Sequence, residues 1–354
     1  MNALHVTSTA EGTGKTAVSL ALARIARERG ATVGYMKPKG TRLRSAVGKT
    51  RDEDPVLAMD LLDLDADIGE LEPVVYSPTF VQEAIRGRER PDALRERITE
   101  AFEALSADVD LLIVEGGGDV WTGGVVDLTD VDVANLLDTR VMLLTKYAEG
   151  SDLDPVLAAT RALGDRLEGV LFNAVADADR DEIVEDVAPF LDGRGIRTVG
   201  ALPRDPDLAG VVVTELAESI GAEVLAGEPD GPIVERFAVG AMGSDAALEH
   251  FHRLRNAAVV TGGDRPEIQT AAMEAPGVTC LVLTGGYQPP DAVLGRAEAR
   301  GVPVLLVRSD TRTTVDRIED VLTSGRTRTA GTVERMRELL EDGVDLDSLL
   351  GLET

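Results

Sequence analysis

The chain has 354 residues, of which 44% are hydrophobic and 28% charged, and its formal net charge at pH 7 is −27. Apolar residues are plentiful and fall in periodic blocks, which excludes a disordered chain, and the single Cys280 excludes a disulfide scaffold and indicates a reducing compartment. The acidic balance disfavours a nucleic-acid partner, because phosphates would be repelled.

The N-terminus and the basic residues predict a cytoplasmic protein adapted to salt. Residues 1–9 lack the basic region and long apolar segment of a signal peptide. No uncharged apolar run reaches the roughly 18 residues that a membrane helix needs, so we expect no membrane partner. Five of the 36 basic residues are lysines. This scarcity of lysine, together with the acidity, resembles the proteins of high-salt archaea, in which surface acidity maintains solubility.

Up to about residue 208 the chain alternates short apolar runs with segments of helical periodicity. The predicted strands span 4–9, 32–37, 110–115, 140–146, 169–173 and 198–203. Several of them are apolar almost throughout, as expected when both faces of a parallel sheet are buried. Helices are predicted between them over 15–28, 91–105 and 154–166. This alternation predicts an α/β domain with a doubly wound parallel sheet.

A Pro/Asp-rich break at residues 205–209 predicts the start of a second, smaller α/β domain. A short helix is expected over 214–220, followed by alternating strands and helices over 257–261, 266–274, 279–284, 291–300, 302–309 and 313–323. One more helix is expected over 332–341, before an acidic end. We place the domains at 1–209 and 210–326, and we expect the tail, 327–354, to serve packing or subunit contacts rather than chemistry.

The strongest signal for function is a glycine-rich loop between the first predicted strand and helix, Ser8-Thr9-Ala10-Glu11-Gly12-Thr13-Gly14-Lys15-Thr16. Such a loop points backbone N–H groups at phosphates in front of a helix N-terminus, and it supplies a lysine for the β/γ-phosphates and a hydroxyl for Mg²⁺. The alternative is a degenerate loop kept only as a turn. We predict that the nucleotide is bound by Thr9, Gly12, Thr13, Gly14, Lys15 and Thr16.

The few lysines supply a second, independent signal. In an arginine-rich chain, a retained lysine indicates a place where a compact point charge is needed. Lys15, Lys37 and Lys146 lie at or next to the carboxyl ends of predicted strands, where open α/β sheets bind ligands. We therefore assign Lys15 and Lys37 to the catalytic set. Lys39, Lys49 and Lys146 stay open between a ligand role and a structural one.

Polar side chains at three further places extend the predicted site. Glu115 ends a strand and precedes three glycines, which leave room for a ligand beside its carboxylate. Asp54 is a second candidate, because Mg²⁺ beside phosphates takes one or two carboxylates together with a hydroxyl and water. Asn173 ends another strand, where its amide could face a purine edge or cap a turn.

Together these positions resemble the dethiobiotin synthetase-like branch of P-loop proteins. In that family Thr9 is the usual residue at its place in the loop, and a Lys-Pro pair follows the second strand, as at Lys37. Further matches are Asp54-Pro55-Val56-Leu57, Val114-Glu115-Gly116-Gly117-Gly118, Val170-Leu171-Phe172-Asn173 and Gly200-Ala201-Leu202-Pro203. The resemblance implies that Thr16, Asp54 and Glu115 hold Mg²⁺, and that Asn173 and Pro203 belong to the ATP site.

The second part of the chain resembles a DRTGG domain. The matching residues are Val260-Thr261-Gly262-Gly263-Asp264-Arg265-Pro266, Thr284-Gly285-Gly286 and Ser309-Asp310-Thr311. Its two Thr-Gly-Gly turns could form a rim that accepts an anion, or could serve packing and dimerisation. The pairing of the two domains resembles the N-terminal region of long phosphate acetyltransferases, over residues 1–325. The acetyltransferase domain of those enzymes has no counterpart here, so we do not expect acetyl transfer by this chain itself.

Two functions are compatible with these patterns. The first is a regulatory protein that binds ATP and Mg²⁺, acts through the second domain, a homodimer or a separate metabolic enzyme, and is linked to acetyl-CoA metabolism. The second is an ATP-dependent ligase or synthetase that acts on a small anionic substrate such as a carboxylate or carbamate. A partition ATPase is disfavoured because Ala10 stands where those proteins carry a second lysine.

Overall fold

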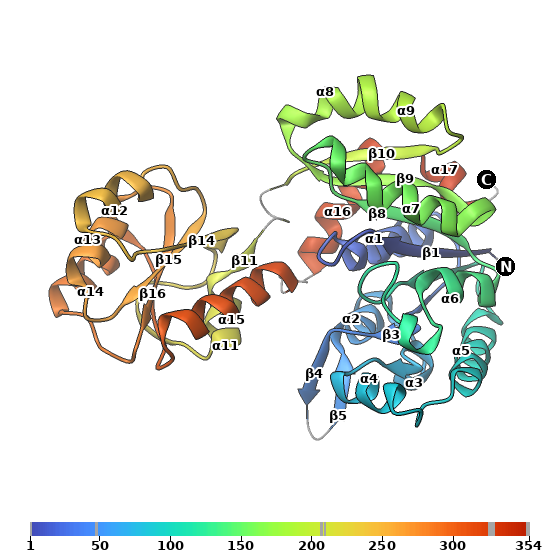
Figure 1. The fold of residues 1–354 in the computed structure, drawn as a ribbon, viewed down its shortest axis with the longest axis horizontal. Coiled ribbons are helices and arrows are strands. Elements are labelled where there is room, and N and C mark those ends of the chain that lie inside the picture. The colour runs from blue at the N-terminus through green and yellow to red at the C-terminus, as the bar shows by residue number, and fades with distance from the viewer. Residues whose placement is uncertain (1, 47–48, 206–207, 209, 325–329, 352–354) are drawn as a thin grey trace. The chain divides into compact units, whose positions relative to one another are not determined.

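The computed structural model describes residues 2–46, 49–205, 208, 210–324 and 330–351, with side chains described except at 44–46, 49 and 323–324. Lys49, whose role the sequence leaves open, is therefore outside the described side chains. The chain forms two compact units, and each is described by itself (Figure 1). The first unit contains the chain up to Arg204 together with two C-terminal helices, α16 (Ala330–Gly343) and α17 (Leu346–Leu350).

A parallel six-stranded sheet forms the centre of the first unit. Its strands are β1 (Asn2–Ser8), β2 (Val33–Met36), β7 (Leu111–Glu115), β8 (Arg140–Thr145), β9 (Leu167–Val175) and β10 (Thr198–Pro203). They lie in the order β10-β9-β8-β1-β7-β2, and each neighbouring pair is parallel. The chain therefore changes direction across the sheet beside β1, which is the place where such sheets bind ligands.

Helices cover both faces of this sheet. They are α1 (Lys15–Glu28), α2 (Glu53–Leu62), α3 (Ile68–Leu71), α4 (Pro78–Ile85), α5 (Pro91–Ser106), α6 (Asp130–Leu137), α7 (Leu153–Leu163), α8 (Arg180–Glu182) and α9 (Ala188–Asp192). Helices α1 and α16 pack together on one face, whereas α5, α6 and α7 lie on the other. The central strands are buried on both sides, as their apolar runs predict.

Short elements complete the first unit. Strand β3 (Lys39–Gly40) pairs with β6 (Val74–Val75), and β4 (Leu43–Ala46) forms an antiparallel hairpin with β5 (Lys49–Asp52). Short helical turns follow at η1 (Gly124–Val126), η2 (Gly150–Asp152), η3 (Gly164–Arg166), η4 (Asp177–Asp179) and η5 (Ile183–Val187). The predicted helix 154–166 ends earlier, at Leu163, because Gly164 has a positive φ of 56°.

The second unit contains a five-stranded sheet in the order β12-β17-β16-β15-β14. Its elements are β11 (Val211–Val212), α11 (Val213–Ile220), β12 (Glu223–Ala226), β13 (Ile233–Val234), β14 (Arg236–Val239), α12 (Ser244–Phe251), β15 (Ala257–Gly262), α13 (Pro266–Glu274), β16 (Val278–Thr284), α14 (Asp291–Arg300), β17 (Val304–Leu306) and α15 (Thr311–Ser324). Strand β12 is antiparallel to β17, and the other neighbours are parallel. Separate apolar cores lie on the two faces of this sheet.

The α/β class and the doubly wound parallel sheet are confirmed. Helix α16 packs against α1 and β10 of the first unit, and Gly200 forms an isolated bridge with Val344. The domain boundaries at 209 and 326 fall outside the described residues and remain our proposal. Within the described ranges, no helix combines the length and apolar character needed to cross a membrane.

Candidate functional site

The glycine-rich loop joins β1 to α1 at the carboxyl end of β1, where the order of the strands changes direction. Gly12 and Gly14 adopt positive φ angles of 65° and 96°, which favour glycine. The Asn173 side chain donates a hydrogen bond from Nδ2 to the carbonyl of Thr13, at 2.7 Å. A Cβ on Gly14 would lie 2.5 Å from that Nδ2. Asn173 therefore contacts the loop backbone, and its predicted contact with adenine stays a prediction.

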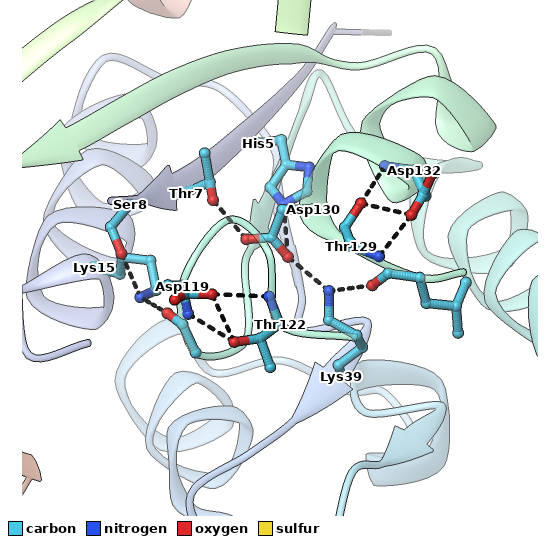
Figure 2. Close-up of polar contacts among 12 residues, drawn as sticks. His5, Thr7, Ser8, Lys15, Lys39, Asp119, Thr122, Thr129, Asp130 and Asp132 are labelled. Atoms are coloured by element: carbon cyan, nitrogen blue, oxygen red, sulfur yellow. Dashed lines mark hydrogen bonds and ion pairs between the residues drawn. The ribbon is translucent and has the colours of Figure 1, made fainter. Parts of the chain in front are cut away.

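Lys15 is the first residue of α1, and its ammonium lies against the loop that follows β7 (Figure 2). Its Nζ donates to Ser8 Oγ at 2.7 Å and to the carbonyl of Gly118. Burial lowers the pKa of Lys15 to about 8. The Thr13 hydroxyl is also buried, and it makes no hydrogen bond within the described part of the chain. A buried cation and an unsatisfied hydroxyl in one loop suit the oxygens of a phosphate.

Glu115, at the carboxyl end of β7, connects the loop to Lys37. The Thr16 hydroxyl donates to Glu115 Oε1 at 2.7 Å, and the Tyr35 hydroxyl donates to Oε2 at 2.8 Å. Lys37 Nζ lies 3.6 Å from Glu115 Oε1 and donates a hydrogen bond to Asp54 Oδ2. All four of the residues Thr16, Lys37, Asp54 and Glu115 are buried. The structure thus brings together the side chains assigned to phosphate and Mg²⁺.

Asp52 is a member of this cluster that the sequence reasoning missed. Its Oδ2 lies 2.9 Å from Lys37 Nζ and accepts hydrogen bonds of 2.8 Å from the backbone N–H groups of Thr41 and Arg42. Its Oδ1 accepts from the Asp54 N–H and so caps α2. The available signal was the acidic run at residues 52–54, in which an N-cap aspartate just before a helix was recognisable.

The donor set fits a magnesium ion. Three carboxylates, from Asp52, Asp54 and Glu115, face the ammonium of Lys37. The Arg42 guanidinium lies 4.0 Å from Asp54 Oδ1, so three acidic groups meet two basic ones. Among the described residues, no group of three or more His, Cys, Asp or Glu side chains is arranged to hold a metal by itself. Mg²⁺ beside phosphates needs no such cage, because it takes one or two carboxylates and completes its shell with phosphate and water.

The remaining predicted residues lie at neighbouring strand ends. The Thr9 hydroxyl is 2.9 Å from the hydroxyl of Thr145, at the end of β8. Pro203 ends β10 and lies opposite Val175, two residues beyond Asn173 on β9. None of these contacts joins Thr9 or Pro203 to the carboxylate cluster, and their roles toward the nucleotide stay predictions.

Glu72 is a buried carboxylate next to this cluster. Both of its oxygens lie 3.2 Å from the backbone nitrogen of Asp52, and its Oε2 is 3.7 Å from the guanidinium of Arg51. The pKa of Glu72 is raised from 4.5 to about 7, mainly because the side chain is buried. Ionisation of this side chain near neutral pH therefore opposes folding.

A Glu72→Gln variant is expected to be more stable than the parent at pH 8 and equally stable near pH 4. The pKa of Glu72 is higher in the folded than in the unfolded chain, so the parent loses stability as the pH rises from about 4.5 to about 7. The full difference corresponds to about 3 kcal/mol as an upper value. Thermal unfolding across this pH range measures it, with the exposed Glu70→Gln as control. Parallel curves for parent and Glu72→Gln would contradict the raised pKa.

Comparison with known proteins identifies the family. Residues 2–212 match the family described as an AAA domain (AAA_26), and residues 215–321 match the DRTGG domain. The first match covers more than half of the chain, so the chain belongs to this AAA domain family, and a DRTGG domain follows the AAA domain. The P-loop class and the resemblance to this pair of domains, inferred from the motifs, are confirmed.

Two kinds of curated relative match different lengths of the chain. A phosphate acetyltransferase from Pseudomonas putida is 25% identical over 343 residues, which cover 91% of this chain and 47% of that enzyme. An ATP-dependent dethiobiotin synthetase from Methanococcus vannielii is 29% identical over 185 residues, covering 52% of this chain and 84% of that protein. The chain thus spans about half the length of the phosphate acetyltransferases that it matches.

Proposed function

We propose that this protein binds ATP with Mg²⁺ in the cytoplasm and acts as a nucleotide-responsive regulator linked to acetyl-CoA metabolism. The observation that carries the nucleotide site is the convergence of Lys15, Thr16, Lys37 and Glu115 at the edge of the sheet beside β1. Buried cations attract phosphates strongly, because little water screens them. The unsatisfied Thr13 hydroxyl supports the same site.

In this proposal each predicted residue has a distinct role. Lys15 and Lys37 neutralise the phosphates, as compact charges at helix and strand ends do. Thr16, Asp54 and Glu115 hold Mg²⁺, which supplies charge neutralisation to the phosphates when it is bound. The other contacts to the nucleotide come from the loop residues Thr9, Gly12, Thr13 and Gly14. Asn173 contacts the adenine, and Pro203 completes the ATP site.

The regulatory role is supported by the pairing of an AAA domain with a DRTGG domain and by the relatives that share it. The phosphate acetyltransferases match this chain over about half of their own length. We infer that nucleotide binding acts on a homodimer partner or on a separate metabolic enzyme, and that this pair of domains does not itself catalyse acetyl transfer.

A second candidate function is an ATP-dependent ligase or synthetase. It is favoured by the dethiobiotin synthetases, which match over 80% or more of their own length. In such chemistry an anionic substrate oxygen attacks the γ-phosphate, and the protein contributes alignment and charge neutralisation. Lys37, buried beside Asp54 and Glu115, suits that task.

Calorimetric titration with ATP and Mg²⁺ in multimolar KCl tests the proposal, with phosphate release followed in the same samples. Saturable binding with little phosphate release is the expected result. Rapid release that depends on a small carboxylate or amine would overturn the regulatory role in favour of the ligase. Absence of binding by the parent protein would overturn the nucleotide site itself.

A Glu115→Gln variant is expected to weaken the dependence of binding on Mg²⁺ more than binding itself. The amide keeps acceptor capacity for Thr16 but removes a negative charge that favours the divalent cation. ATP titrations at several Mg²⁺ concentrations measure the change, and we expect about a tenfold higher Mg²⁺ requirement, or about 1.4 kcal/mol. The exposed Glu103→Gln serves as control. A Glu115→Gln protein with the parental Mg²⁺ requirement would remove Glu115 from the metal site.

A further inference from the structure

A second buried cluster of charged and polar side chains lies beside the loop (Figure 2). Lys39, on β3, is 0% exposed, and Asp130, at the start of α6, is 1% exposed. Lys39 Nζ donates to Asp130 Oδ1 at 2.7 Å and to the carbonyl of Leu128 at 2.5 Å. The Thr7 hydroxyl donates to Asp130 Oδ2, also at 2.5 Å. The function proposed above uses none of these side chains.

The charges in this cluster are one cation and one anion. Burial lowers the pKa of His5 to about 4, so the imidazole, whose Nε2 is 4.0 Å from Asp130 Oδ1, is neutral at pH 7. Burial by itself would raise the pKa of Asp130, but Lys39 and the hydrogen bonds hold it below its usual value. Lys39 and Asp130 therefore form a fully buried ion pair.

Such a pair contributes little to stability by itself. The cost of removing both charges from water is comparable to the attraction between them, and apolar replacements of similar volume are often as stable. The role of the Lys39–Asp130 pair therefore depends on the groups that it contacts.

Both partners of the pair pack directly against the glycine turn that follows β7. A Cβ on Gly116 would lie 2.0 Å from Asp130 Oδ2. A Cβ on Gly117 would lie 2.3 Å from the backbone oxygen of Lys39. Atoms of Asp130 and Lys39 thus occupy the space where side chains at Gly116 and Gly117 would begin, and the turn is held against them.

The same glycine turn holds Lys15 of the nucleotide loop. The carbonyl of Gly118 accepts a hydrogen bond from Lys15 Nζ, and so does Ser8 Oγ. Backbone hydrogen bonds join the same segments, because the Val120 N–H donates to the Ser8 carbonyl at 2.8 Å. A continuous set of contacts therefore leads from the Lys39–Asp130 pair through the glycine turn to Lys15.

We propose that Lys39 and Asp130 are positioning residues of the nucleotide site, whose ion pair fixes the glycine turn at residues 116–118 and thereby the ammonium of Lys15. The inference rests on the proposed function where it concerns nucleotide affinity. The placement of Lys15 can be measured without any nucleotide.

The test uses a double variant, Lys39→Met with Asp130→Asn. Removing one partner alone would leave a buried charge uncompensated and would unfold part of the population, whereas neutralising both avoids that cost. Met fills much of the volume of the lysine stem, and Asn keeps an acceptor for the Thr7 hydroxyl. Thermal unfolding and circular dichroism establish that the double variant is folded.

The first readout is the rate at which N-hydroxysuccinimidyl acetate modifies Lys15 in the nucleotide-free protein, followed by mass spectrometry. The rates compared are those of the neutral amine, obtained from the pH dependence, because loss of Asp130 also lowers the pKa of Lys15. We expect at least a fivefold faster reaction of this amine in the double variant, because the side chain is no longer held against Ser8 and Gly118. The exposed Lys146 is the internal control, and its rate should not change. The second readout is ATP affinity, which we expect to fall about tenfold while binding of adenosine is unchanged.

Parental rates at Lys15 in a folded double variant would overturn the inference, whatever the ATP affinity. If the parent protein binds no ATP but the Lys15 rate rises in the double variant, the proposed function fails and the positioning of Lys15 stands. If the double variant does not fold, the acylation rate of Lys15 is measured in Thr7→Val instead. This substitution removes only the hydroxyl that donates to Asp130. A two- to threefold faster reaction at Lys15 in Thr7→Val supports the inference, and an unchanged rate overturns it.

Discussion

A Lys15→Ala variant is expected to lose about 100-fold in affinity for ATP with Mg²⁺. Hydrogen bonds to charged groups contribute about 1.5–3 kcal/mol each, and the upper value corresponds to roughly that factor. Lys15 is placed to make them, because it begins α1 behind the loop and its ammonium lies at Ser8 and Gly118. Calorimetric titration of parent and variant in the same KCl buffer measures the difference.

The control for this experiment is Arg161→Ala, which removes an exposed basic side chain from the last turn of α7 in the same unit. Thermal unfolding separates binding from stability. Burial lowers the pKa of Lys15, so its charge is costly in the folded protein, and the alanine variant should unfold no earlier than the parent. A Lys15→Ala protein that binds ATP as the parent does would move the phosphate site away from this loop.

A Gly117→Ala variant is expected to lose at least about 3 kcal/mol of stability in the first unit, the size typical of severe overpacking. The new Cβ would lie 2.3 Å from the backbone oxygen of Lys39, well inside any normal contact. Lys39 cannot withdraw easily, because its side chain is bonded to Asp130 and Leu128 and its strand β3 is paired with β6. Denaturant unfolding followed by circular dichroism measures the loss.

Gly150→Ala is the matched control for this substitution. Gly150 lies in the turn η2 of the same unit, and a Cβ there would meet no atom within 4 Å. We expect Gly150→Ala to unfold within about 0.5 kcal/mol of the parent. Equal stability of Gly117→Ala and Gly150→Ala would show that the turn after β7 moves freely, and it would also remove the basis for positioning by Lys39.

The class of the fold, the glycine-rich loop and the positions of most elements are predictable from the amino-acid sequence. Helix α1 begins at Lys15 and ends at Glu28, as the periodicity predicts, and α13 and α14 also have the expected bounds. These features depend on local patterns. A run of apolar residues indicates a buried strand, and a glycine-rich loop before a helix indicates a phosphate site, wherever the rest of the chain lies.

The pairing of the charged side chains, in contrast, is visible only in the folded chain. Asp52 lies two residues before Asp54, yet nothing local indicates that both carboxylates face the Lys37 ammonium. Lys39, which the sequence left open, is paired with Asp130, 91 residues away. In a chain with 63 acidic residues, composition and spacing do not single out such partners. Folding places them, because it brings Lys37, just after β2, against Asp52 and Asp54, and it brings Lys39, on β3, against the first residue of α6.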